Sequence, residues 1–425
     1  MPQSLFVGLD LGSSRIRFAM GQVSASSREH APTFAIIGAV DVPSQGISKG
    51  TVSALEDAVA AVSAGLEAAE RQIGVPIDDV VVGIGGPHIT LVPAKGVVGV
   101  NRADGQIRPE DVDRVLESAR GSVNPANHEI LHVLSRGFIV DGQAGITDPV
   151  GMHGIRLEAA AQLIVGLAGN VRNMTRCVFR TRLDISSLVF GALAAAEAVT
   201  VPRERELGVC VVNIGASTTS VLVYEDGSLL HAAVIPLGAD HVTSDIAIGL
   251  RTSLAVAEEV KLLHGNAVPD AVAKREALDL SAFGGEAGEP ITTRDVAEIA
   301  EARVEELFEK VEHELRAVDR SGLLPAGAVL TGGGAKLPGM TDVAKRVLRL
   351  PASIGAATHI LSPMPEHAHD PAFSTAVGLA QYGYDEWRRG SEQGGGGGRK
   401  MLASGSAMMG KIGGLAKKVF GSFMP

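Results

Sequence analysis

Apolar residues form short strand-like runs along much of the chain, and one run-and-turn pattern occurs twice, about two hundred residues apart. Residues 5–19 hold an apolar run with an acid near its end, a turn of small residues and a second run. Residues 209–223 repeat this order with an amide in place of the acid. Small turn residues let backbone N–H groups point at anionic oxygens. Two such hairpins facing one another predict a triphosphate site, whereas either copy alone would favour an ordinary hairpin with a polar turn.

The spacing of apolar residues predicts alternating strands and helices after the first hairpin. Strands are expected at 35–42, 80–84, 157–165 and 328–331. A helix at 52–73 is expected to be capped by Thr51 or Ser53. Further helices are expected at 170–181, 185–199, 240–249, 254–263, 293–320 and 340–348, and the fold is expected to close with 371–383. The stretch 268–289 has a weak pattern and is expected to be irregular.

The character of the sequence changes between residues 88 and 166, where short strands at 90–94, 96–100 and 130–139 bracket a helix at 109–120. We interpret this stretch as an inserted α+β subdomain within an α/β chain of two lobes. The expected divisions are a first lobe at 1–87, 167–203 and 355–388, the insert at 88–166, a second lobe at 204–354 with an outer part at about 240–325, a linker at 389–405 and a terminal helix at 406–425.

Length and composition fit a globular protein. The 425 residues, 45% of them hydrophobic and 20% charged, suffice for two lobes with large cores. No uncharged apolar run reaches the length of a membrane span, and the first residues lack a secretory leader pattern. Cys177 and Cys210 stand in apolar surroundings and are expected to be reduced core thiols of a cytoplasmic protein.

Charge is distributed unevenly along the chain. The last 27 residues carry five basic and no acidic side chains, a charge of +5. Since the net charge of the chain is −10, the rest of the chain carries −15. An acidic body argues against nucleic acid as a partner.

The first turn offers a candidate metal and phosphate site. Asp10 would hold Mg²⁺ through water, as is usual for this reluctantly dehydrated ion. Arg15 and Arg17 are two residues apart, so they share one strand face, and either guanidinium could reach a β- or γ-phosphate. A turn-initiating role for Asp10 and a structural ion pair for one arginine are the alternatives.

The second turn departs from the first because Asn213 stands where the acid would be. An amide can position a metal-bound water but lends less electrostatic help, so slow hydrolysis is expected. No catalytic residue is assigned beyond Asp10 and Asn213 as metal- or water-positioning candidates.

Two further elements suit a nucleoside. Gly332, Gly333 and Gly334 follow a strand and would let a flat ring approach the backbone, unless they form a plain helix-entry turn. Glu258 and Lys261 are three apart on a helix face and could meet ribose and adenine, or simply pair with each other.

Two phosphate turns followed by a triple-glycine turn resemble the superfamily of actin, sugar kinases and chaperone ATPases. Within it, the chain is similar to the FtsA family of bacterial cell-division proteins over roughly residues 5–383. The insert motifs at 129–133, 145–152 and 154–157 and the stretches at 242–247 and 374–379 carry this resemblance.

The resemblance implies a two-lobed, ribonuclease-H-like actin fold with an inserted subdomain called 1C. It implies ATP with Mg²⁺ in the cleft, a filament-forming protein, and a tether between the division protein FtsZ and the inner face of the membrane at the septum. The FtsZ C-terminal peptide would bind the second lobe and later division proteins the insert. Phosphate contacts would fall on Gly12, Ser13, Ser14, Gly215, Ala216, Ser217 and Thr218. A helix at 184–188 would normally carry a water-orienting Gln or Glu, which this chain lacks there.

The tail has the composition of an interfacial helix. Read as a helix, residues 408–424 are roughly 26 Å long, with an apolar side and lysines mostly opposite. Its glycines disfavour helix in water, so folding is expected only on an anionic membrane. The expected contacts are Lys411, Ile412, Leu415, Lys417, Lys418, Val419, Phe420 and Phe423. Docking of this helix on the body or a partner protein is the alternative.

Two related functions compete with this interpretation. A pilus-assembly actin homologue of the PilM kind shares the fold and a similar insert but has no need of a basic amphipathic tail. A sugar kinase needs a catalytic aspartate in a substrate cleft and gives the insert no role.

Overall fold

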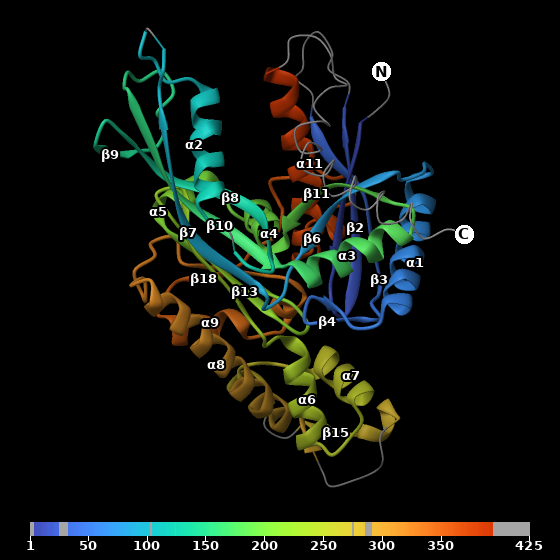
Figure 1. Ribbon diagram of the computed structural model, residues 1–425. Helices are drawn as coiled ribbons and strands as arrows, with labels where there is room; N and C mark the ends of the chain where they lie inside the picture. Colours follow the sequence, from blue (N-terminus) through green and yellow to red (C-terminus); the bar gives the residue numbers. More distant parts are fainter. Residues whose placement is uncertain are drawn as a thin grey trace.

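The computed structural model describes residues 4–24, 33–102, 104–123, 125–273, 276–284 and 291–393. Within these ranges the chain forms two lobes and an insert, each built around its own sheet (Figure 1). The five-glycine run at 394–398, the tail and its expected lipid contacts lie outside the described residues.

The two lobes contain sheets of the same topology. In each, three consecutive antiparallel strands are followed by two strands parallel to the first. The first sheet has the order β11-β6-β1-β2-β3, with β1 (Leu5–Leu11), β2 (Arg15–Val23), β3 (Phe34–Pro43), β6 (Asp79–Ile84) and β11 (Asp184–Phe190). The second has the order β14-β13-β12-β17-β18, with β12 (Val209–Ile214), β13 (Thr219–Glu225), β14 (Ser228–Ile235), β17 (Ala328–Thr331) and β18 (Ala352–Ile354).

Helices cover the sheets and complete the α/β architecture. The first-lobe helices are α1 (Leu55–Ile73), α3 (Ala168–Arg180), α4 (Gly191–Val199), α10 (Pro365–Ala368) and α11 (Ser374–Gln393), and the short α5 (Pro202–Leu207) leads into the second lobe and packs on β13. The second-lobe helices are α6 (Ala239–Gly249), α7 (Leu254–His264), α8 (Thr293–Ala317) and α9 (Met340–Leu348). Two short antiparallel pairs, β4 (Ile47–Ser48) with β5 (Thr51–Val52) and β15 (Ala277–Leu278) with β16 (Ile291–Thr292), complete the described strands of the two lobes.

The insert is a four-stranded sheet with one helix packed on it. Its strands have the order β7-β10-β8-β9, with β7 (Ile89–Gly99), β8 (His128–Val140), β9 (Gln143–Ile146) and β10 (Arg156–Leu167), and its helix is α2 (Pro109–Ser122). The two short strands expected at 90–94 and 96–100 are one strand, because β7 pairs with β10 along its whole length.

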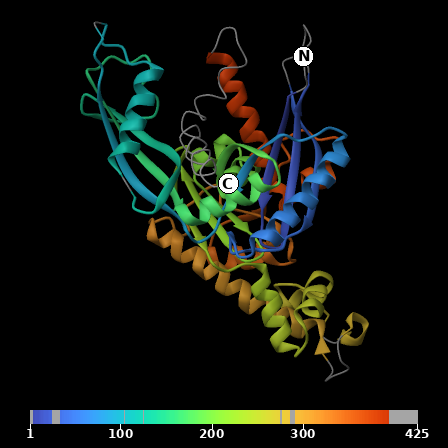
Figure 2. The ribbon, with the colours of Figure 1, turned by 45° about the vertical axis from the view of Figure 1, so that its right-hand side comes forward.

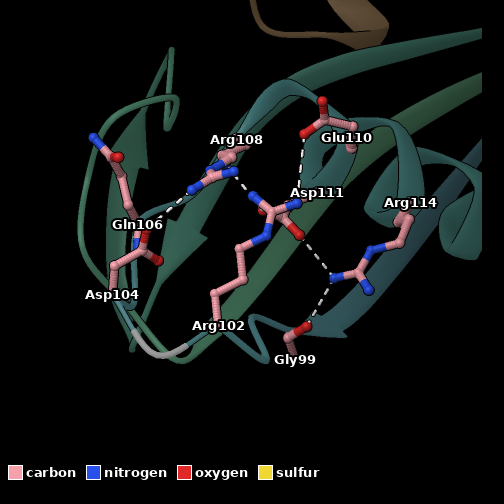
Figure 3. A network of polar contacts seen from close by, with 8 residues as sticks. All are labelled: Gly99, Arg102, Asp104, Gln106, Arg108, Glu110, Asp111 and Arg114. Carbon is pink, nitrogen blue, oxygen red and sulfur yellow. Dashed lines mark hydrogen bonds and ion pairs between the residues drawn. The ribbon is translucent and has the colours of Figure 1, made fainter.

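A buried carboxylate fixes α2 to the insert sheet (Figure 3). Asp111 accepts hydrogen bonds from the Arg108 backbone N–H at 3.0 Å and from Arg114 Nη2 at 2.8 Å, and pairs with Arg102 Nη1 at 3.3 Å. Arg114 Nη2 also donates to the Gly99 carbonyl at the end of β7. The polar contacts therefore join both ends of the β7–α2 connection.

One hydrophobic core is shared by the three parts of the molecule. Ile84 and Phe190 of the first lobe, Ile164 of the insert and Val211 and Leu222 of the second lobe belong to the same buried cluster. The insert also reaches the second lobe through Gln162 Nε2, which donates to the Leu230 carbonyl. Both lobes and the insert therefore pack on one another rather than being joined by the chain alone.

Three further sequence expectations are wrong. Residues 184–190 form strand β11 and not the start of a helix, because this segment pairs in parallel with β6 at the edge of the first sheet. Neither Thr51 nor Ser53 caps α1, whose N-cap is Ala54 without a side-chain bond, since Thr51 lies in the hairpin β4–β5. The helix expected at 293–320 ends at Ala317.

Candidate functional site

A cavity of about 640 Å³ lies between the lobes. Its volume is within the range of ordinary small-ligand sites. Every candidate from the two turns, the triple-glycine segment and α7 lines it: Asp10, Gly12, Ser13, Ser14, Arg15, Arg17, Asn213, Gly215, Ala216, Ser217, Thr218, Glu258, Lys261, Gly332, Gly333 and Gly334. Four segments distant in sequence therefore meet around one space.

The first turn connects β1 and β2 and presents small residues to the cavity. A Cβ at Gly12 would lie 2.5 Å from the Arg15 carbonyl oxygen. Such a contact is too short for any side chain, so the tight turn requires glycine here.

Asp10 faces Arg17 across the β1–β2 pair. Burial raises the pKa of the Asp10 carboxyl above its ordinary value, and the Arg17 charge partly opposes this. Desolvation penalises the charged form, so a cation at this carboxylate would be favoured.

The structure separates the two candidate arginines. Arg15 is exposed and pairs with Asp41 of β3 at 3.3 Å. The Arg17 guanidinium lies over the Phe373 ring at 5.6 Å, and its buried Nε has no hydrogen-bond partner among the described residues. Arg17 therefore keeps hydrogen-bonding capacity at the cavity, while Arg15 is engaged in an ion pair.

The second turn binds to its surroundings more than the first. Asn213 Nδ2 donates to Thr375 Oγ1 of α11 at 3.2 Å, which joins the second lobe to the first. Ser217 Oγ donates to Asp240 Oδ2 at the start of α6. The Gly215 N–H donates to the Thr218 carbonyl and closes the turn.

The triple-glycine segment leaves open space where side chains would otherwise project. Gly332 has φ +87°, and its Cβ would lie 2.4 Å from Asn213 Oδ1. A Cβ at Gly333 would meet only Arg17 Nη2 at 3.8 Å and Ala372 at 3.9 Å. Gly332 is thus required by the fold, whereas the space beside Gly333 is free for a ligand.

Glu258 and Lys261 form an ion pair of 2.6 Å on α7. Lys261 is buried and also donates to Thr243 Oγ1 at 2.8 Å, while Glu258 is 42% exposed. Glu258 and Lys261 therefore do pair with each other, as the alternative interpretation expected, and both residues also line the cavity. The exposed part of the Glu258 carboxylate is accessible to a ligand, and the aliphatic part of the Lys261 side chain could pack against one.

The cavity also contains residues that sequence reasoning missed. Gly50, Gly85, Gly191, Ala192 and Thr375 line its first-lobe side. The Gly85-Gly86-Pro87 cluster directly after the strand at 80–84 is the sequence signal that points to this side of the cavity. The expected water-orienting helix at 184–188 is a strand. The helix that borders the cavity there is α4, which contributes Gly191 and Ala192 without polar side chains.

The residues at Asp10 fit a hydrated Mg²⁺ held jointly with a phosphate ligand. The part of the chain that the structure describes contains no cluster of three His, Cys, Asp or Glu side chains placed to hold a metal alone. Mg²⁺ commonly binds one or two carboxylates together with substrate phosphates and several waters. The single carboxylate and the neighbouring Arg17 Nε match that mode.

Both cysteines are buried and unbridged. Burial raises the pKa of Cys177 to about 11 and that of Cys210 to about 12. Of the helices in the described ranges, none has the length and apolarity needed to cross a bilayer.

Comparison with known structures gives the fold class. The chain is similar to the structure of a PilM–PilN type IV pilus biogenesis complex, with a TM-score of 0.62, 17% identity and coverage of 89% of this chain and 98% of that one. It is also similar to MreB5 of Spiroplasma citri bound to ADP, with a TM-score of 0.53, 12% identity and coverage of 92% and 99%. The expected two-lobed, ribonuclease-H-like actin fold with an insert is confirmed.

Sequence comparison gives the family. Residues 210–378 match the model of the cell division protein FtsA, and residues 86–165 match the SHS2 domain inserted in FtsA. FtsA of Bacillus subtilis (strain 168) is 36% identical over 378 residues, covering 89% of this chain and 83% of the relative. FtsA of Escherichia coli (strain K12) is 34% identical over 398 residues, covering 92% and 93%. The chain therefore belongs to the FtsA family of actin-like cell-division proteins.

Proposed function

We propose that the interlobe cavity binds ATP with Mg²⁺. The observation that carries the proposal is the convergence of both hairpin turns, the triple-glycine segment and α7 on one cavity. Gly12, Ser13 and Ser14 would contact the phosphates from the first lobe, and the turn at 215–218 would contact them from the second. Glu258, Lys261 and the glycines at 332–334 would hold the nucleoside.

Within this site Arg17 rather than Arg15 is the proposed phosphate ligand. Its Nε has no hydrogen-bond partner among the described residues and its guanidinium lies over Phe373, so Arg17 can donate a hydrogen bond to a phosphate oxygen. Asp10 would hold Mg²⁺ through water. A bound Mg²⁺ would supply charge neutralisation for the phosphate oxygens.

We further propose that hydrolysis is slow at most. The Asn213 amide donates to Thr375 and carries no charge to activate water. Gly85, Gly191 and Ala192 border the same part of the cavity without a side chain able to orient a nucleophile. Binding with slow turnover suits a switch better than a fast enzyme.

Gly333 offers a direct test of the ligand site. A side chain there enters open space, so Gly333→Val should fold normally and occlude the nucleoside position. Gly121→Val is the matched control, because a Cβ at Gly121 of α2 meets nothing within 4 Å and Gly121 does not line the cavity. Calorimetric titration with Mg-ATP should detect heat in the wild type and in Gly121→Val, and at least a tenfold loss of affinity in Gly333→Val, about 1.4 kcal/mol. Equal affinity in both variants would refute this site.

For the whole chain we propose the role of a membrane tether in division. The protein would polymerise, bind the FtsZ C-terminal peptide on the second lobe, and contact later division proteins through the insert. Residues 406–425 would attach it to the inner face of the membrane at the septum. Family membership supports this proposal, as do the exposed apolar side chains of the outer second lobe, Ile248, Leu254 and Leu263. We propose the same limits for the two lobes, the insert, the linker and the terminal helix as those expected from the sequence.

A PilM-like pilus function is the alternative. It shares the fold but has 17% identity, against 34–36% for the FtsA relatives. A sugar-kinase function has less support, because the insert matches a domain described as inserted in FtsA.

Electron microscopy on anionic lipid monolayers tests the tether. Full-length protein with ATP should form filaments on the lipid and recruit FtsZ, and removal of residues 399–425 should abolish both. A variant lacking the tail that still coats the monolayer would refute the tail as anchor. Filaments that fail to recruit FtsZ would refute the tethering role while leaving assembly intact.

A further inference from the structure

Four aromatic rings meet where the first-lobe sheet packs against the last helix. Phe6 of β1, Phe34 of β3, and Tyr384 and Trp387 of α11 form a connected cluster. Phe34 stacks on Tyr384 with 4.9 Å between ring centroids, and Trp387 lies 5.9 Å from Phe6 and 6.1 Å from Tyr384. These separations are within the favourable range for aromatic pairs.

The backbone beneath the cluster leaves no room for it to shift. A Cβ at Gly21 would lie 2.3 Å from the Phe34 ring, so this ring rests directly on β2. A Cβ at Gly8 would lie 2.1 Å from the Ala376 carbonyl oxygen, so α11 touches the backbone of β1. The Phe34 ring and the first turn of α11 are therefore packed directly against the first-lobe sheet.

The exposed residues 387–389 of α11 combine an aromatic ring with two arginines, and their side chains leave different sides of the helix. Trp387, the chain's single tryptophan, is 41% exposed. The Arg388 guanidinium lies over the Tyr384 ring at 5.9 Å and pairs with Asp385 at 3.2 Å, and Arg389 is exposed beside them. Glu386 in the same turn is directed toward β11, where its carboxylate accepts a hydrogen bond from Ser187. Tryptophan with arginine is the composition that settles at membrane–water interfaces.

This surface lies where the described chain ends. Both views show the C-terminal end of α11 projecting at the same end of the molecule as the start of β1 and β3 (Figures 1 and 2). The composition of residues 394–405 predicts a coil with an r.m.s. length of roughly 19 Å. A tail helix bound to lipid would thus hold this end of the body near the bilayer at high effective concentration.

We propose that the Trp387–Arg389 surface is a second contact with an anionic lipid bilayer. This inference rests on the proposed membrane attachment through residues 406–425. The tail would supply most of the affinity, and the aromatic end of α11 would fix the orientation of the body on the lipid. A tether alone would leave that orientation free.

The single tryptophan makes the proposal measurable in the full-length protein. Vesicles containing phosphatidylglycerol and a brominated lipid should quench Trp387 emission and shift it to shorter wavelength. Two variants serve as controls. Trp387→Phe removes the signal, and Phe179→Trp added to it moves the only tryptophan to α3, where Phe179 is 45% exposed. That double variant should bind vesicles without quenching.

Charge provides the second measurement. Replacing both Arg388 and Arg389 by Gln should weaken vesicle affinity by up to about fivefold per residue, which corresponds to about 1 kcal/mol for a basic residue near an anionic surface. The same substitutions should reduce Trp387 quenching.

The outcomes separate the inference from the function on which it rests. Full-length protein that sediments with vesicles while Trp387 stays unquenched overturns the second contact and leaves the tail anchor standing. Full-length protein that does not sediment overturns the anchor and this inference together. If removing residues 394–425 changes Trp387 emission without vesicles, and lipid never quenches it, the tail itself covers the surface and the lipid contact is wrong.

Discussion

The two hairpins that border the cavity have the same topology but different chemistry. Around the first turn, the buried Arg17 Nε has no hydrogen-bond partner among the described residues, and burial raises the pKa of the Asp10 carboxyl above its ordinary value. Around the second turn, Asn213 donates to Thr375 and Ser217 donates to Asp240. One copy of the shared architecture therefore keeps polar capacity for a ligand, and the other uses it to join the lobes.

The largest difference in stability between the two turns is expected when their equivalent glycines, Gly12 and Gly215, are replaced. In Gly12→Ala the new Cβ lies 2.5 Å from a carbonyl oxygen, and in Gly215→Ala it lies 3.1 Å from one. Overpacking of this kind costs about 1–3 kcal/mol, so Gly12→Ala should approach about 3 kcal/mol and Gly215→Ala stay near about 1 kcal/mol. Denaturant unfolding without nucleotide measures both free energies. Equal losses would show that the two turns are equally tight.

Asp10→Asn should affect stability and binding in opposite directions. Burial raises the Asp10 pKa, so the folded state holds its proton more firmly than the unfolded chain. The stability due to this group is present below its unfolded pKa and is lost as pH rises through the raised folded pKa. Asn should therefore increase the melting temperature of nucleotide-free protein at neutral pH.

Mg²⁺-dependent ATP affinity should fall by about tenfold or more in the same variant, because the carboxylate that holds the hydrated ion is gone. Calorimetry with and without EDTA measures this. Asn213→Asp is the converse variant and should strengthen the Mg²⁺ dependence. If both variants keep wild-type metal dependence, the proposed difference between the turns is wrong.

The two arginines sharpen the comparison within the first lobe. Arg17→Gln should weaken ATP binding by about tenfold, as expected for loss of a charge-assisted phosphate contact. Arg15→Gln should change affinity less than about twofold, because exposed ion pairs such as Arg15–Asp41 contribute little. Titration of a fluorescent ATP analogue compares them, and a larger effect from Arg15 would reverse the assignment.

The smallest effect on stability is expected for loss of the hydrogen bond between Asn213 and Thr375, which joins the two lobes. Thr375→Val removes the acceptor for Asn213 with little change in shape, which should cost about 1 kcal/mol of unfolding free energy. Thr375→Ser keeps the hydroxyl and is the matched control. Unfolding curves that do not distinguish the two would show that this bond does not stabilise the lobes.

Local pattern was sufficient for most elements and for the cavity residues of the two turns, the triple-glycine segment and α7, but it missed the first-lobe side of the cavity. Alternating apolar runs located both hairpins and the strand before Gly332, and helical spacing located α1, α6, α7 and α9. The same pattern failed at 184–190. Its apolar residues suit either a helix or a buried strand, and pairing with β6 decided the outcome.

The sequence by itself determined where the chain turns and which turns consist of small residues, because those properties depend on residues that are neighbours in the sequence. Only the tertiary structure decided which polar groups remain available. Asp41 on β3 engages Arg15, Phe373 lies beneath Arg17, and Thr375 meets Asn213 from 162 residues away. Partners so distant along the chain leave no periodic signal, since their contact depends on the packing of whole lobes.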